Sequence, residues 1–450
     1  MDPELPQRQA GALAGRRPRR RARGALCALL AAIACCAIPE VARAVPYGLG
    51  DPNLDVHCPS PASCPAQAWL DPLIHGGYGM SYVRTTLPYD AVAGADASGR
   101  CIWAGTGAGG FTNPDPHRAG QQYHTFLFHW LLAAKRLGLE PVVSLTAATG
   151  VGDRPVPSTS WLDQRKYYCA VYWTLWATAR WGVPIRHLEA WNEPDVNGYA
   201  ASPGGAAADY NTANRAVEEA HADHPEVPGA ALAAGTLSTM SCARGGVCSN
   251  LVTFLNDYIS GLRSTPGYWS FHDYDDVSAA GAEQTSPYVT NLEAFDEVLT
   301  ARYGSGYRAP IWITEAGARL DQPNIKEPDG AEPGCDNGEP DAYNPAWGGG
   351  YKVGNCLDWA PEEALARIRQ AWAAQAFHDL AALPSGRVTQ VDWWTPNDAA
   401  GSGWDSALLD PAGKPRASYC VLAYAESPQT AAADGRCAGN PLDAGDLGER

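Results

Sequence analysis

Short apolar segments alternate with longer amphipathic segments along most of the chain. The short segments span four to six residues, and their composition is typical of buried strands. Eight strands are predicted, at residues 46–49, 82–85, 141–145, 187–191, 231–234, 268–272, 311–314 and 388–393. Because the segments recur almost to the C-terminus, the pattern predicts one repeated arrangement of strand and helix.

The segments between the strands repeat apolar residues three and four positions apart, as amphipathic helices do. Helices are predicted at residues 121–137, 164–181, 206–222, 251–262, 292–302 and 362–380. Alternating strands and helices favour parallel strand pairing, and eight such units in about 400 residues predict an α/β fold, the (β/α)8 TIM barrel with long βα loops. A doubly wound open sheet is the alternative.

Two long segments rich in Gly, Pro, Asp and Asn, 88–120 and 318–359, follow predicted strands. In a barrel these βα loops gather at the carboxyl ends of the strands, so we expect them to wall a binding site. We assign residues 45–425 to the barrel and 426–450 to a C-terminal turn and a flexible acidic tail. Little chain remains after the last strand, so no separate accessory domain is expected.

The first 44 residues have the organisation of a secretory signal peptide. An arginine-rich start precedes the apolar run 24–38, and Ala42-Arg43-Ala44 matches a small-residue cleavage pattern. A membrane anchor is the alternative, but a bilayer span needs roughly 20 apolar residues and this run is shorter. The sequence therefore predicts a secreted protein with no membrane association after cleavage.

The charge and the cysteines agree with an exported protein. The whole chain carries a net charge of −16, and the part after residue 44 is more acidic still. Such a surface repels nucleic acid at long range, so we expect no nucleic-acid partner.

Ten cysteines follow residue 44, and pairing each with its nearest neighbour gives five disulfides: Cys58–Cys64, Cys101–Cys169, Cys242–Cys248, Cys335–Cys356 and Cys420–Cys437. The sequence does not prove this connectivity. A zinc site at Cys242 and Cys248 lacks a second ligand pair, so no metal is predicted.

Two glutamates end predicted strands in matching contexts. Glu193 follows the fourth strand in Trp191-Asn192-Glu193-Pro194, and Glu315 follows the seventh in Ile313-Thr314-Glu315. Strands four and seven of one barrel would bring both carboxyls to the same mouth. Cleavage of a glycosidic bond needs one carboxylic acid to protonate the leaving oxygen and one carboxylate to attack or stabilise the sugar. The pair therefore predicts a glycosidase.

These motifs resemble glycoside hydrolase clan A, the retaining (β/α)8 enzymes, and look most like glycoside hydrolase family 39. The resemblance implies that Glu193 is the acid/base, that Glu315 is the nucleophile and that Asn192 binds the sugar 2-hydroxyl. It departs from family 39 in Ala316-Gly317 after the nucleophile and in the missing accessory domain. The departures leave the substrate open but not the mechanism.

The resemblance also implies supporting roles for four residues. Arg84 would keep Glu315 ionised and oriented, His272 and Tyr274 match the pair after strand six, and Trp394 matches the floor of the sugar subsite, or Trp393 if the strand register is shifted by one. Glu189 points into the barrel by its spacing from Glu193, and we expect a structural ion pair or a hydrogen-bonded layer there.

The sequence thus predicts a secreted retaining glycoside hydrolase that cleaves O-glycosidic bonds by double displacement, with no cofactor and with an oligo- or polysaccharide or a glycoside as substrate. Ionised Glu315 is expected to raise the pKa of Glu193. One alternative is a catalytically silent carbohydrate-binding or cell-wall interaction protein on the same barrel. Another is a transglycosylase. The sugar, the linkage and the choice of exo or endo action stay open.

Overall fold

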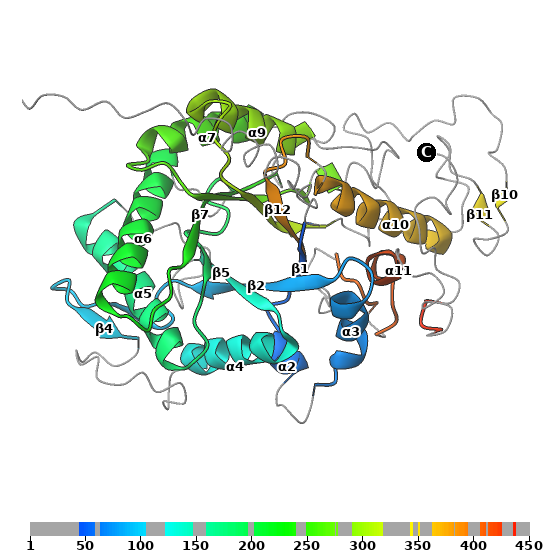
Figure 1. Cartoon of the computed structure of the whole chain (residues 1–450), viewed down its shortest axis with the longest axis horizontal. Helices are drawn as coiled ribbons and strands as arrows, with labels where there is room; N and C mark the ends of the chain where they lie inside the picture. The colour runs from blue at the N-terminus through cyan, green and yellow to red at the C-terminus, as the bar shows by residue number, and fades with distance from the viewer. Residues whose placement is uncertain are drawn as a thin grey trace, which may run out of the picture. The chain divides into compact units, whose positions relative to one another are not determined.

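Eight parallel strands close on themselves to form a barrel (Figure 1). Around the barrel they are β1 (Tyr47–Gly50), β12 (Val388–Trp394), β9 (Ile311–Ala316), β8 (Tyr268–His272), β7 (Ala231–Ser238), β6 (His187–Glu189), β5 (Glu140–Thr146) and β2 (Met80–Pro88), which pairs back to β1. Each strand pairs with the barrel strand before it and the one after it in the chain. The (β/α)8 prediction is confirmed over the doubly wound sheet, and all eight predicted strands are present.

The computed structural model describes residues 45–58, 64–104, 122–146, 159–196, 202–239, 249–274, 276–277, 290–317, 343–344, 350–351, 362–381, 383–394, 406–410, 413–424 and 435–437. These residues all belong to one unit of the chain, Val45–Arg450. The predicted signal segment 1–44 and most of the C-terminal segment 426–450 lie outside the described residues, so both assignments stay predictions.

The helices are α2 (Leu54–His57), α3 (Gln67–His75), α4 (Gln122–Leu137), α5 (Trp161–Arg180), α6 (Pro203–Asp223), α7 (Ser249–Gly261), α9 (Thr290–Tyr303), α10 (Glu362–Leu380) and α11 (Ala417–Tyr424). Six of these helices were predicted, each to within three residues at both ends. The pattern did not give bounds for α11 because every one of its residues is buried, which leaves no polar face to mark a period. Within the described part of the chain, no helix is both long and apolar enough to cross a bilayer.

The first long insert carries an antiparallel hairpin, β3 (Ala93–Ala95) with β4 (Cys101–Trp103). The second insert contributes β10 (Tyr343–Asn344) and β11 (Gly350–Tyr351), and its other residues lie outside the described part. Disulfides join Cys58 to Cys64, Cys101 to Cys169 and Cys420 to Cys437, which confirms three predicted pairs. The predicted pairs Cys242–Cys248 and Cys335–Cys356 fall on residues that are not described.

The strands are buried on both faces, but the two faces differ in chemistry. On β9, Ile311 and Ile313 belong to the apolar core between the strands and the helices. Thr314, which follows them toward the carboxyl end of the strand, instead donates a hydrogen bond to Glu189 inside the barrel. The interior therefore contains a polar layer, and this layer supports the site described below.

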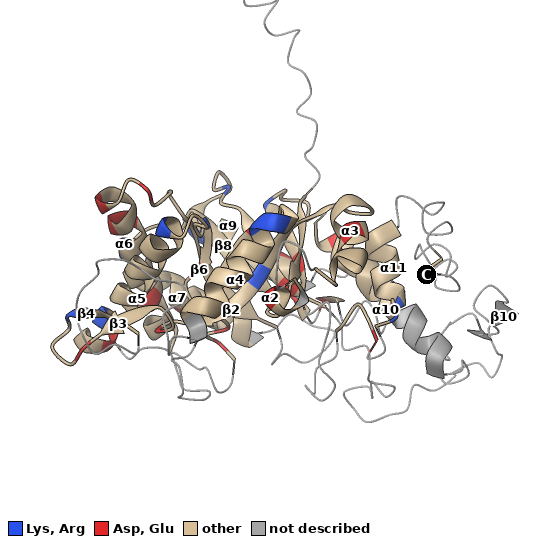
Figure 2. Ribbon diagram, turned by 90° about the horizontal axis from the view of Figure 1, so that it is seen from below, with Lys and Arg blue, Asp and Glu red and all other residues tan. Residues whose placement is uncertain are grey.

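Charged residues of both signs are spread over the described helices. Figure 2 shows basic residues on α4 and beside β4, and acidic residues on α2, α3 and α6. Lys135 and Arg136 lie in the last turn of α4, where positive charge complements the helix dipole.

Candidate active site

Glu193 sits in a strained turn directly after β6. The predicted strand 187–191 ends two residues early, at Glu189, and the Glu193 backbone then takes a φ of 48°. Its amide donates to the carbonyl of Thr236 on β7 at 3.0 Å, and Thr236 has a φ of 55°. A positive φ is costly for residues with a side chain, so the hydrogen bonds to neighbouring strands must hold this turn. The turn aims the Glu193 carboxyl over the barrel mouth.

The early end of β6 also sets the direction of Trp191. A strand that continued to residue 193 would place Trp191 on the same face as Glu189 and Glu193, but its ring packs against Tyr89 and against Tyr167 of α5. The alternation fails because residue 190 already lies outside the strand.

Glu315 lies near the end of β9 and is held by two donors. Nη1 of Arg84 donates to one carboxylate oxygen, and the hydroxyl of Tyr274 donates to the other. Both donors are buried. A carboxylate fixed at both oxygens keeps one orientation, and both hydrogen bonds favour its ionised form.

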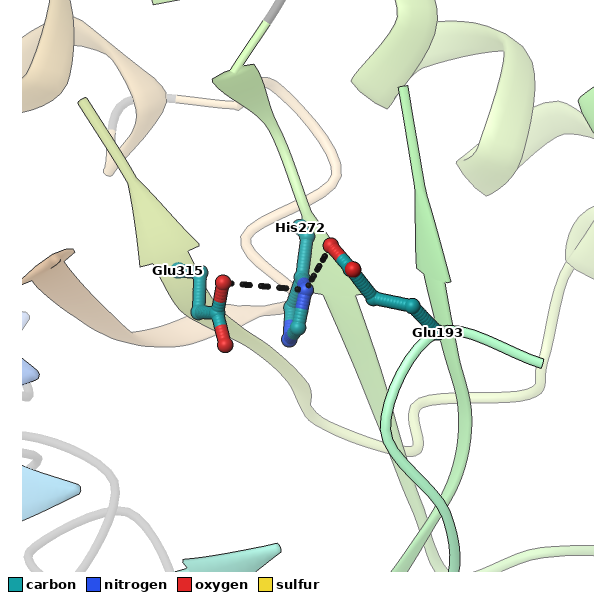
Figure 3. Close-up of side chains that lie close together, drawn as sticks. All are labelled: Glu193, His272 and Glu315. Atoms are coloured by element: carbon teal, nitrogen blue, oxygen red, sulfur yellow. Dashed lines mark hydrogen bonds and ion pairs between the residues drawn. The ribbon is translucent and has the colours of Figure 1, made fainter. Parts of the chain in front are cut away.

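His272 lies between the two glutamates (Figure 3). Its Nδ1 is 2.8 Å from Oε1 of Glu193 and 3.4 Å from Oε2 of Glu315. One oxygen from each glutamate and one nitrogen of His272 all lie within 4.8 Å of one another. Retaining glycosidases hold their two carboxyls about 5–5.5 Å apart, whereas inverting enzymes leave roughly 6.5–9.5 Å for a water molecule. The closest oxygens of Glu193 and Glu315 are therefore near enough for both carboxyls to act on one bond.

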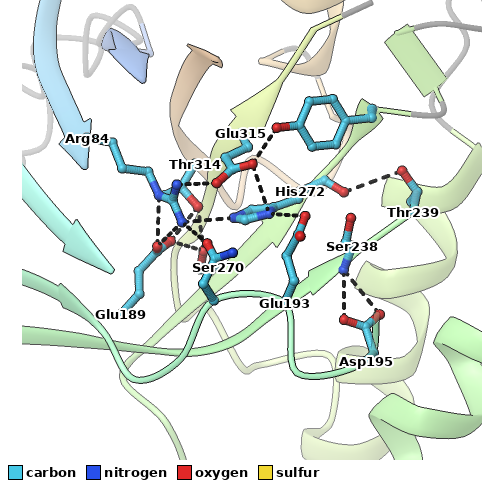
Figure 4. Close-up of polar contacts among 12 residues, drawn as sticks. Arg84, Glu189, Glu193, Asp195, Ser238, Thr239, Ser270, His272, Thr314 and Glu315 are labelled. Atoms are coloured by element: carbon cyan, nitrogen blue, oxygen red, sulfur yellow. Dashed lines mark hydrogen bonds and ion pairs between the residues drawn. The ribbon is translucent and has the colours of Figure 1, made fainter. Parts of the chain in front are cut away.

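Arg84 connects the site to the polar layer of the barrel (Figure 4). Its Nε donates to Glu189 at 2.9 Å and its Nη2 to Asn192 at 2.7 Å. Glu189 also accepts hydrogen bonds from the hydroxyls of Ser270 and Thr314. The predicted structural ion pair of Glu189 is therefore confirmed, with Arg84 as its partner.

Trp394 faces the site because β1 has no side chain at the intervening position. Gly50 pairs with Arg84 on one side and with Trp394 on the other. A Cβ on Gly50 would lie 2.1 Å from the indole ring, so only glycine fits there. The Arg84 guanidinium lies over the Trp394 ring at 5.4 Å. Trp393 points the other way and packs against Phe377 of α10.

The structure thus brings together all seven residues that the sequence proposed for the site. Hydrogen bonds and one cation–π contact link each of them to at least one other: Arg84, Asn192, Glu193, His272, Tyr274, Glu315 and Trp394. Their catalytic roles stay predictions, because a contact fixes position and not function.

The pKa directions of the two glutamates are the reverse of the expected order. Burial raises the pKa of Glu315, and the positive charges of His272 and Arg84 offset this rise only in part. Burial also acts to raise the pKa of Glu193, but the hydrogen bond and the charge of His272 outweigh it, so the pKa of Glu193 is lowered. The expectation that Glu315 sets the pKa of Glu193 overlooked His272, which lies closer to Glu193 than to Glu315.

Arg84 determines which nitrogen of His272 carries a proton. Its Nη2 lies 3.2 Å from Nε2 of His272, and a guanidinium nitrogen has hydrogens to donate but no lone pair to accept. Nε2 must therefore be the acceptor, which leaves Nδ1–H to donate to Glu193. In an imidazolium, Nε2 of His272 would also carry a hydrogen, and two donors, Nε2 and Nη2 of Arg84, would face each other. The charge of Arg84 accordingly acts to lower the pKa of His272, against the two carboxylates that raise it.

Asp195 is a charged neighbour of Glu193 that the sequence analysis did not find. Both of its carboxylate oxygens lie 3.1 Å from the amide of Ser238 at the end of β7 (Figure 4). Burial, with the negative charge of Glu193, raises the pKa of Asp195 to about 7. The only sequence signal was its position two residues after Glu193, since its partner is a backbone amide that any residue supplies.

The cluster could also be considered as a metal site. Within the described residues, Glu193, His272 and Glu315 form a group whose side chains could coordinate a metal ion. Arg84, however, donates to Glu315 and lies against His272, so a fixed positive charge already occupies the cluster. That charge would oppose a cation, and the donor set fits an acid pair better than a metal centre.

No protein-family model and no curated protein matches this chain. Several solved structures are similar to it. The structure of a fungal β-1,4-galactanase is 12% identical, covers 84% of this chain and 98% of the other, and has a TM-score of 0.46. A broad specificity endoglucanase of glycoside hydrolase family 5 from Clostridium acetobutylicum is 15% identical, with coverage of 84% and 95% and a TM-score of 0.44.

The catalytic domain of a glycoside hydrolase family 53 protein from Ignisphaera aggregans is also 15% identical, with coverage of 78% and 86% and a TM-score of 0.41. Because identities and scores are this low, the activity of this chain is inferred from the geometry of its own side chains. The resemblance to family 39 stays a prediction.

Proposed function

We propose that this protein is a retaining glycoside hydrolase that acts by double displacement. The observation that carries the proposal is the buried pair Glu193 and Glu315, with one oxygen of each within 4.8 Å at the mouth of the barrel. Each carboxyl has different partners, as two different roles require. Glu315 accepts from Arg84 and Tyr274, and Glu193 from His272.

In the first step, Glu315 attacks the anomeric carbon while Glu193 gives its proton to the leaving oxygen. The bond between the anomeric carbon and the leaving group breaks, and a glycosyl ester forms on Glu315. The ester has lost the negative charge of Glu315. Glu193, now ionised, removes a proton from water, and the water attacks the anomeric carbon and frees Glu315.

The neighbours support this division of labour. Arg84 and Tyr274 hold the attacking carboxylate in one orientation. The side-chain oxygen of Asn192 accepts a hydrogen bond from Arg84, which leaves the Asn192 amide hydrogens for a sugar hydroxyl. Trp394 offers an aromatic surface beside Arg84 on which a sugar ring could stack. We further propose that the protein is secreted, because residues 1–44 have the organisation of a signal peptide. We also propose, from its motifs, that the protein is related to glycoside hydrolase family 39.

The test is activity together with stereochemistry. Purified protein should release phenol from at least one member of an aryl glycoside panel, and NMR spectra recorded early should show the product with the anomeric configuration of the substrate. An inverted first product would reject the retaining mechanism. Binding of sugars with no cleavage of any panel member would favour the silent binding protein, and products joined to an added acceptor alcohol would indicate transglycosylation.

A further inference from the structure

Trp161 is a large apolar side chain left open to solvent on a protein that buries most of its aromatic residues. It is 68% exposed, and among the described residues only Val56 is a comparably exposed large apolar side chain. Single exposed apolar residues are common and need no explanation by themselves. Trp161 differs because the chain beneath it is built to hold the ring.

The turn between β3 and β4 lies against the outer edge of the six-membered ring of the indole. Gly99 is buried, and a Cβ there would come within 2.3 Å of the ring. Gly99 also has a φ of 81°, which a side chain would strain. Nε of Arg165, one turn along α5, donates to the carbonyl of Gly99 at 3.1 Å. The glycine therefore leaves room for the edge of the ring beside the turn.

A covalent link fixes this support to the helix that carries the ring. The disulfide Cys101–Cys169 joins β4 to α5, and both views of the molecule place β4 beside α5 (Figures 1 and 2). Ser98 and Arg100, on either side of Gly99, are exposed and bonded to Asp96. The result is a rigid aromatic face with hydroxyl and charged groups at its edge, which loses little conformational freedom when a ligand stacks on it.

The platform lies on the same face of the barrel as Glu193. Helix α5 begins where the βα loop after β5 ends, so its first residue belongs to the face at which the strands deliver their carboxyl ends. Tyr167 of the same helix donates its hydroxyl to the carbonyl of Ala190, three residues before Glu193. Trp161 is six residues earlier, or about 9 Å along the helix axis. Trp161 is therefore offset along α5 from the residue that contacts the segment leading to Glu193.

We propose that Trp161 is a stacking platform for a distant sugar unit of a neutral polysaccharide. The proposal rests on the glycosidase function proposed above and names its substrate class as polymeric. An indole face suits the C–H face of a pyranose, and the polar edge suits its hydroxyls. The net charge of −16 disfavours acidic polysaccharides at long range.

The test measures binding without cleavage. Affinity electrophoresis in native gels containing hydroxyethylcellulose, galactan or galactomannan uses Glu193→Gln as the parent, so that the polymer stays intact. At least one polymer should retard the parent, and adding Trp161→Ala should weaken that association roughly tenfold. Adding Val56→Ala, at the other equally exposed apolar residue, should change nothing. Gly99→Ala should weaken retardation although Trp161 is still present, because its Cβ displaces the ring.

Kinetics with the otherwise native protein supply a second readout. Trp161→Ala should raise KM on the retarding polymer roughly tenfold with kcat unchanged, and should leave kcat/KM on an aryl glycoside unchanged. If no gel retards the parent, or if Trp161→Ala and its parent are retarded equally, the platform proposal is wrong. Retardation that depends on Trp161 in a protein without glycosidase activity would reject the proposed function and keep the platform. Circular dichroism melts check that each variant is folded.

Discussion

Nδ1 of His272 lies 2.8 Å from Oε1 of Glu193. The same nitrogen is within 3.4 Å of Glu315, so one ring contacts both halves of the proposed acid pair. Burial lowers the pKa of His272, but the two carboxylates raise it further than burial lowers it. Glu193, the proposed acid/base, therefore lies beside a second titrating group. The titrations of Glu193, His272 and Glu315 are coupled, so each apparent pKa belongs to the three residues together.

Asp195→Asn should leave the alkaline limb of the kcat/KM profile within about half a pH unit of its native position. The negative charge of Glu193 helps to raise the pKa of Asp195 to about 7, whereas the pKa of Glu193 is lowered, so Asp195 is uncharged over the range in which Glu193 titrates. Replacing a neutral carboxylic acid by an amide removes no charge there, and the acid form of Glu193 should be lost at the same pH. Activity measured from pH 4 to pH 9 checks the position of the limb.

The amide of Asn at residue 195 keeps an acceptor for Ser238, so the turn should persist in this variant. Asp257→Asn is the control, because it removes one negative charge from an exposed position on α7. An alkaline limb that moves to lower pH in Asp195→Asn but not in Asp257→Asn would mean that Asp195 is already ionised where Glu193 titrates.

Arg84→Met should destabilise the fold by about 3–5 kcal/mol near pH 7, because Glu189 would keep a buried charge without its partner. With Arg84 gone, the folded-state pKa of Glu189 would rise above its unfolded value. The native state would then bind the extra proton, so the loss of stability should shrink as the pH falls through that raised pKa. Urea unfolding at pH 5 and pH 7 measures this difference.

Arg180→Met is the matched control, since Arg180 is exposed at the end of α5 and stacks on Trp176. It should change the free energy of unfolding by less than about 1 kcal/mol. A penalty for Arg84→Met that is equal at both pH values would mean that lost packing, and not unpaired charge, explains the effect.

The strands could be predicted from the sequence because barrel strands are short apolar runs between longer periodic segments. The helices α4 to α10 followed for the same reason. Arg84 and Glu315 are 231 residues apart, and only the motif resemblance, not any local pattern, placed them together. The contact of Asp195 with the Ser238 amide and the support of Trp161 by Gly99 depend on how two loops meet, and hydrophobic periodicity contains no information about that.

Replacing Cys101 and Cys169 with serine should lower the free energy of unfolding by roughly 4 kcal/mol. The disulfide closes a segment with a sequence separation of 68, so it restricts the unfolded chain strongly. The same change at Cys58 and Cys64, which are separated by 6, should cost only about 2 kcal/mol. Equal losses for the two pairs would contradict the idea that each disulfide stabilises the protein by restricting the unfolded chain.

Mass analysis without reduction should also find no free thiol among the ten cysteines after residue 44.

The two glutamates can be told apart by the products that azide gives with their alanine variants. Glu193→Ala removes the proton donor, so substrates with poor leaving groups should suffer most, whereas an activated aryl glycoside should still transfer its sugar to Glu315. Azide should then rescue turnover, because it attacks the glycosyl ester without help from a base. Two displacements at the anomeric carbon give a glycosyl azide of retained configuration.

For Glu315→Ala the expected stereochemistry is opposite. No glycosyl ester can form, and azide in the space left by the carboxylate can displace the leaving group only once, from the opposite face. The product should be the inverted azide, and the substrate should need a leaving group as good as fluoride. NMR of the isolated azides assigns their configuration. A retained azide from Glu315→Ala together with an inverted azide from Glu193→Ala would exchange the two roles. Near-native activity of both variants would place the chemistry at other residues, because neither glutamate would then be needed to break the bond.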